Sequence, residues 1–195
     1  MNKIILKGLI RNIQFSHFIQ DIEFYKAEML VTDDNGKENI INIKFKRFSN
    51  PYQEGDEALL IGNIRTYSQK LDTKNKVEVY VFTYFDEPEE LETNKVELDG
   101  HICKKGDLRK TKDGKDVIDF IIANNLKLDN QSLNCYIPCV AWGKLAKQIN
   151  KMSIGDYINI IGKLQSREYK KKLSNDDFEI RVAHEVNINE IIKDE

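Results

Sequence analysis

Aromatic and basic side chains share one face of two predicted strands in the second half of the chain. Apolar and polar residues alternate over 133–142 and again over 156–167 and just beyond, which sets Tyr136, Trp142 and Tyr169 opposite the apolar face. Exposed rings stack on nucleobases, at roughly 1–3 kcal/mol per base whatever the sequence, and neighbouring cations contact phosphates. The pattern therefore favours binding of an unpaired nucleic-acid strand.

A short helix is predicted between these two strands. Leu145, Ile149 and Met152 recur at the spacing of an amphipathic helix, and Gly155 is expected to end it. The chain thus runs strand, helix, strand, with rings and positive charge on the outward face of both strands.

This order of elements, and the sequence motifs within it, resemble those of a known family. VAWGKLA at 140–146, the Gly-Asp pair at 155–156 and GKLQSREY at 162–169 are similar in sequence and spacing to the oligonucleotide-binding (OB) fold of bacterial single-stranded-DNA-binding proteins. NKVELDG at 94–100 resembles the opening strand of that fold. The resemblance covers about 94–188 and is weak over 1–85.

The resemblance implies a set of site residues. The family has base-stacking aromatic residues at the positions that match Tyr136, Trp142 and Tyr169. We expect phosphate contacts from basic residues on the same unit, some on strands and some in a flexible lysine loop and the first hairpin. These are Lys144, Lys163, Arg167, Lys170, Lys171, Lys172, Arg109 and Lys112.

An internal repeat indicates two copies of one unit. NKIILKG at 2–8 recurs as NKVELDG at 94–100, and a Gly-Asp pair followed by Ile-Gly recurs with an offset of 100. We therefore predict an all-β chain of two tandem five-stranded OB-fold barrels, as domains 1–88 and 89–195. The second barrel has its strands at roughly 94–103, 116–126, 133–142, 156–167 and 177–188, and a short helix between its third and fourth strands.

The first copy offers a second candidate surface. A strand with Ile41, Ile43 and Phe45 on its apolar face follows the Asn35-Gly36 turn, and strands are predicted at 56–67 and 75–85. Segment 48–54 contains Pro51 and is too short for the helix of the second copy. The residues opposite the apolar face are weaker binding candidates: Phe48, Arg65, Tyr67, Lys44 and Lys46.

Charge and composition bound the function. The chain of 195 residues has a net charge of -2, but residues 1–94 hold 12 basic and 16 acidic side chains against 18 and 16 in residues 95–195. Three scattered histidines form no recognisable catalytic or metal motif, so we expect no enzyme, no metal and no cofactor. The three cysteines are predicted to be small buried hydrophobic residues.

The sequence leaves two functions open. The first is sequence-tolerant binding of single-stranded DNA in replication, repair or recombination. The second is a tandem module that binds RNA or a protein partner, and the acidic first half favours the protein partner. Four barrels per particle in the resembling family imply a homodimer here. No membrane span or leader is recognised, so a cytoplasmic protein is expected. The sequence stops at Glu195, just past the last predicted strand, so recruitment through an acidic tail is not expected.

Overall fold

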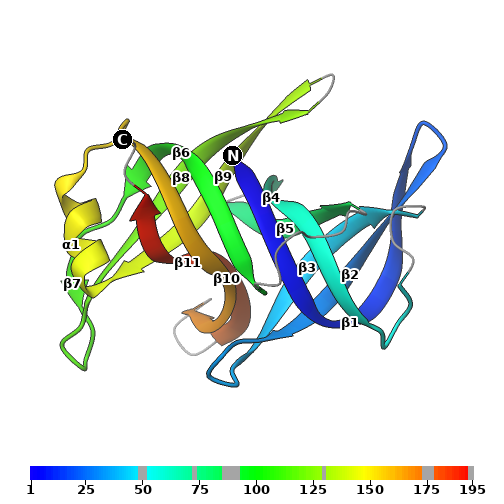
Figure 1. Cartoon of the computed structure of the whole chain (residues 1–195), viewed down its shortest axis with the longest axis horizontal. Coiled ribbons are helices and arrows are strands. Elements are labelled where there is room, and N and C mark those ends of the chain that lie inside the picture. Colours follow the sequence, from blue (N-terminus) through cyan, green and yellow to red (C-terminus); the bar gives the residue numbers. More distant parts are fainter. Residues whose placement is uncertain (48–51, 72–73, 85–92, 129–130, 173–177, 193–195) are drawn as a thin grey trace.

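The chain forms two small β-barrels that lie side by side (Figure 1). The computed structural model describes residues 1–47, 52–71, 74–84, 93–128, 131–172 and 178–192. The first barrel contains β1 (Asn2–Ile19), β2 (Ile22–Thr32), β3 (Glu38–Lys46), β4 (Glu57–Leu71) and β5 (Lys74–Tyr84). The second contains β6 (Lys95–Lys105), β7 (Arg109–Lys110), β8 (Asp116–Leu128), β9 (Gln131–Trp142), α1 (Gly143–Lys151), β10 (Tyr157–Lys172) and β11 (Phe178–Ile192).

Both barrels close in the same way. β1 pairs antiparallel with β2 and β4, and the ring is completed by a parallel contact between β3 and β5. In the second barrel β6 pairs with β8 and β10, and β9 meets β11 in parallel. The predicted fold of two tandem five-stranded barrels is confirmed, with the two-residue β7 as an added strand and α1 between the third and fourth main strands.

Alternating side chains build each core. Ile41, Ile43 and Phe45 of β3 are buried as predicted, and so are Ile137 and Cys139 of β9. The helix α1 closes the second barrel with Ala146 and Ile149, which are fully buried. Because the core takes one face of each strand, the other face is left for solvent or ligands.

The barrels share a continuous sheet. β1 pairs antiparallel with β6, with Asn2 opposite Leu98. The Asn2 amide exchanges two hydrogen bonds with the backbone of Ile64, both 2.8 Å. The Asn94 amide does the same with Leu164 at 3.0 Å. The junction is therefore a pseudo-two-fold contact between the two repeats.

Two further contacts flank this pairing at repeat-related positions. The Tyr136 N–H donates to Thr66 Oγ1 (2.9 Å), and the Ile40 N–H donates to Ser166 Oγ (3.0 Å). Thr66 and Ser166 differ by the offset of 100 found in the sequence. The third main strand of each barrel therefore contacts the fourth main strand of the other: β9 contacts β4, and β3 contacts β10.

Three details of the sequence interpretation are wrong. Lys170, Lys171 and Lys172 are not in a loop, because β10 continues to Lys172 and pairs there with Phe178. Cys103 is exposed, whereas Cys135 and Cys139 are buried as expected. The helix ends at Lys151, and Gly155, with φ +99°, forms the turn before β10.

Candidate nucleic-acid interface

The three predicted stacking rings are exposed on the second barrel. Tyr136 is 53% exposed, Trp142 40% and Tyr169 37%. Tyr136 and Trp142 project from β9, whose opposite face forms the core, while Tyr169 projects from β10. β11 lies between β9 and β10 in the sheet, so the two groups of rings are separated by one strand. Exposed rings on a barrel surface can stack on bases without loss of the core.

The predicted cations divide into free and paired groups. Lys144 and Lys112 are exposed and form no ion pair within the part of the chain that the structure describes. Lys163 pairs with Asp34 of the first barrel, and Arg109 pairs with Asp119 at 2.6 Å. A cation held by a carboxylate is less available to a phosphate, which favours Lys144 and Lys112 as phosphate contacts.

The end of β10 combines rings and charges. The Arg167 guanidinium lies 6.0 Å from the centroid of the Tyr169 ring and 3.4 Å from a Glu185 carboxylate oxygen. Lys170 is exposed and Lys171 is partly buried; for Lys172 only the backbone is described. The strand pairing with β11 holds these residues in an ordered register instead of a loop.

The first barrel holds a row of stacked side chains on its outer face. His17 stacks on Phe24 with ring centroids 5.0 Å apart, and Phe24 lies 6.2 Å from Phe82. The Arg65 guanidinium lies 4.0 Å from the centroid of Phe82. We call these four residues the ring row. Lys44 stands beside it, 4.0 Å from the centroid of Tyr80 and 3.1 Å from Glu78.

The sequence found only part of this surface. Arg65, Tyr67, Lys44 and Lys46 face outward as predicted, and Phe48 lies outside the described residues. His17, Phe24, Tyr80 and Phe82 were missed. Alternation over residues 79–84, where Val79 and Val81 are buried, is the signal that places Tyr80 and Phe82 outward.

Burial affects the ionisation of the first-barrel surface. Desolvation lowers the pKa of Arg65 and raises the pKa of Tyr80. Both groups are partly buried, and so partly withdrawn from water, although they lie outside the core. Arg65 stays charged, because its ordinary pKa is far above neutrality.

The described residues offer little for other chemistry. Among them no group of three or more histidine, cysteine or acidic side chains is placed to hold a metal ion. No helix within the described ranges is long and apolar enough to cross a membrane.

Comparison with known proteins gives the family. The model of the single-strand binding protein family matches residues 93–191. The single-stranded DNA-binding protein of Oceanobacillus iheyensis is 35% identical over 81 residues, which are 40% of this chain and 50% of that protein. Single-stranded DNA-binding protein A of Bacillus subtilis is 34% identical over 83 residues, which are 40% of this chain and 48% of that protein. The chain spans about half the length of these curated relatives.

The solved structures show how far the fold extends. The wild-type single-stranded DNA binding protein of Thermus aquaticus covers all of this chain with a TM-score of 0.71 and 18% identity, over 93% of its own length. A deletion mutant of that protein gives a TM-score of 0.72 at 19% identity, over 94% of its length. These likenesses support the tandem-barrel fold alone. With the match over 93–191, the chain belongs to the single-strand binding protein family.

Proposed function

We propose that the chain binds single-stranded DNA through the second barrel, without strong preference for sequence. Tyr136, Trp142 and Tyr169 stack on bases, while Lys144 and the lysines at the end of β10 contact phosphates. The observation that carries the proposal is the exposure of all three rings on the barrel that matches the family. Ring faces accept any base, so stacking gives affinity with little discrimination.

Replication, repair and recombination all produce single strands, and we propose that the protein coats them there as a binding protein and not as an enzyme. RNA is the alternative ligand, because ring faces stack on bases of either nucleic acid. Contacts to the 2′-hydroxyl distinguish RNA from DNA, so competition between DNA and RNA strands for the protein tells which ligand it prefers.

A fluorescence titration tests the proposal. Trp142 is the only tryptophan, and a base stacked on its indole should quench its emission as oligothymidine is added. Saturable quenching that is weakened by salt is the expected result. Unchanged emission together with unchanged anisotropy of a labelled strand would contradict the proposed function.

We also propose a division into domains 1–88 and 89–195 and a homodimer that presents four barrels. The boundary falls within 85–92, outside the described residues. The pairing of β1 with β6 supports one two-barrel unit per chain. Light scattering should give a mass of twice 22.7 kDa. A mass equal to one chain at micromolar concentration would overturn the dimer.

A further inference from the structure

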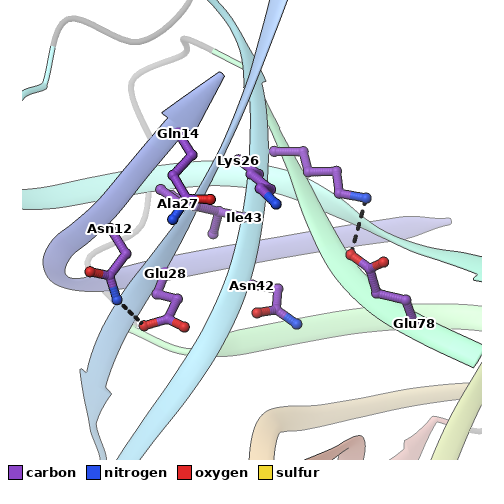
Figure 2. A pocket seen from close by; sticks show the side chains of 9 residues that line it. Asn12, Gln14, Lys26, Ala27, Glu28, Asn42, Ile43 and Glu78 are labelled. Carbon is purple, nitrogen blue, oxygen red and sulfur yellow. Dashed lines mark hydrogen bonds and ion pairs between the residues drawn. The ribbon is translucent and has the colours of Figure 1, made fainter. Parts of the chain in front are cut away.

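A pocket of about 260 Å³ opens on the outer face of the first barrel (Figure 2). Its polar lining comes from four strands and includes Asn12, Gln14, Lys26, Glu28, Asn42 and Glu78. Phe24 and Lys26 are alternate residues of β2 and so lie on the same face. The ring row and the pocket therefore form one surface.

Two amides in this pocket have no hydrogen-bond partner among the described residues. These are the side chains of Gln14, which is exposed, and Asn42, which is partly buried. An amide presents a donor and an acceptor side by side, the arrangement that reads the edge of a base. Asn12 is already engaged, since it donates to Glu28 at 2.8 Å.

Carboxylates set the polarity of the remaining wall. Glu28 accepts from Asn12, and Glu78 accepts from Lys44 at 3.1 Å, yet each carboxylate keeps further lone pairs for an incoming donor. Carboxylates accept hydrogen bonds from exocyclic amino groups of bases. They repel a base edge that presents carbonyl oxygens on both sides of its N–H, as thymine does.

We propose that this pocket binds the edge of a base that carries an exocyclic amino group, as adenine, cytosine and guanine do and thymine does not, while the neighbouring base stacks on the ring row. Lys26, which forms no ion pair within the described residues, reaches the phosphate between them. The first barrel thus discriminates among bases, in contrast to the stacking surface of the second. The inference rests on the proposed binding of single-stranded DNA.

Titrations of the full-length chain test the inference. Labelled oligomers of deoxyadenosine, deoxycytidine and deoxythymidine of equal length are compared by fluorescence anisotropy, in the wild type and in the double variant Gln14→Ala, Asn42→Ala. For each protein we take the ratio of its affinity for the adenosine or cytidine oligomer to its affinity for the thymidine oligomer. We expect this ratio to be at least about fivefold higher in the wild type than in the double variant. Stacking within a free oligomer lowers its affinity for both proteins by the same factor, so this factor cancels when the affinity ratios of the two proteins are compared.

Two single variants separate the parts of the surface. Phe82→Ala should weaken binding of all three oligomers, because it removes the ring that contacts both Phe24 and the Arg65 guanidinium. Phe18→Ala is the matched control. Phe18 is a 61% exposed ring on the β1–β2 hairpin, which also carries His17 and Phe24; it contacts Phe15 and lies outside the ring row. It should change neither affinity nor preference.

Each outcome has a distinct meaning. Equal base preference in the wild type and the double variant, with binding retained, would overturn the base-reading pocket and leave the proposed function intact. Absence of binding to every oligomer would overturn the proposed function itself. Loss of preference in Phe18→Ala would show that the effect comes from the fold of the hairpin, and would also overturn the inference.

Discussion

Trp142 has an exposed side chain on a backbone position that joins a strand to a helix. It is the last residue of β9 and directly precedes α1, with 40% of its surface exposed. Its strand neighbour Ala141 is fully buried, so the backbone at this point is fixed by the core. A ring held on fixed backbone loses little freedom when a base stacks on it, which makes this site suited to binding.

Replacing this ring separates binding from stability. Trp142→Ala should weaken binding of labelled oligothymidine by about 1–3 kcal/mol, because one stacking platform is lost. Thermal melting should change little, since a core tryptophan would instead cost about 3–5 kcal/mol of stability. A variant that melts early but binds normally when folded would contradict the stacking role.

The two lysines near this surface should differ in their salt dependence. Each phosphate neutralised on a single strand contributes about 0.7 to the slope of log K against log salt. Lys144→Ala should reduce the slope by about that amount, because Lys144 is exposed and forms no ion pair among the described residues. Lys163→Ala should leave the slope nearly unchanged, since Asp34 already holds its ammonium group. Equal slopes in the two variants would contradict the proposal that Lys144, and not Lys163, contacts a phosphate.

For the strands and the helix, alternation of apolar and polar residues predicted most of the barrel architecture. The core face of β9, the amphipathic helix and the Asn35-Gly36 turn all follow from local pattern, and each lies where expected. The extension of β10 through Lys172 was missed, because a lysine run has no apolar alternation. It becomes a strand only through pairing with Phe178 and its neighbours on β11.

The candidate site was predicted unevenly for a similar reason. The resemblance to the family's sequence motifs predicted Tyr136, Trp142 and Tyr169 as site residues. Strand alternation predicted that Arg65 and Lys44 face outward. The ring row escaped because it joins β1, β2, β4 and β5, whose side-by-side placement depends on closure of the barrel. His17 and Phe24 are direct partners in the β1–β2 hairpin, but no local pattern reveals that Phe24 meets Phe82, or that a pocket forms beside them.

The pairing of β6 with β8 requires a glycine at position 100. A Cβ at this position would lie 2.4 Å from the Ala123 carbonyl oxygen, and its φ of +154° disfavours other residues. Gly100→Ala should lower the free energy of unfolding by about 2–4 kcal/mol, from crowding and backbone strain together. Gly114→Ala is the control in urea unfolding: Gly114 has φ +76° but open space around it, so only about 1–2 kcal/mol is expected. Equal losses would show that crowding at β6 is unimportant.

The junction between the two barrels contains a titratable group. His184 of β11 lies 2.7 Å from the Ile40 carbonyl oxygen of the first barrel, and burial lowers its pKa below the ordinary value of 6.5. The unfolded chain therefore binds the proton more readily. Stability should be complete above about pH 6.5 and should fall as the pH is lowered through the folded-state pKa. Urea midpoints at pH 7.5 and 5.5 should differ less in His184→Gln than in the wild type; an identical difference would exclude His184.

The shared sheet makes the two barrels interdependent. Asn94 is 3% exposed and satisfies both backbone groups of Leu164, as Asn2 does for Ile64. Removing either amide leaves a buried N–H and a buried carbonyl without partners, so Asn2→Ala and Asn94→Ala should each lower the free energy of unfolding by about 2–4 kcal/mol.

Because β1 and β6 belong to one sheet, the wild type should unfold in urea in a single transition that far-ultraviolet circular dichroism and Trp142 fluorescence report at the same midpoint. Trp142 reports only on the second barrel, whereas circular dichroism reports on both. In Asn2→Ala and Asn94→Ala both signals should shift to lower urea together, because loss of the junction weakens the barrels jointly. Signals that separate in the wild type would show that each barrel folds independently and that the junction is only a contact between finished domains.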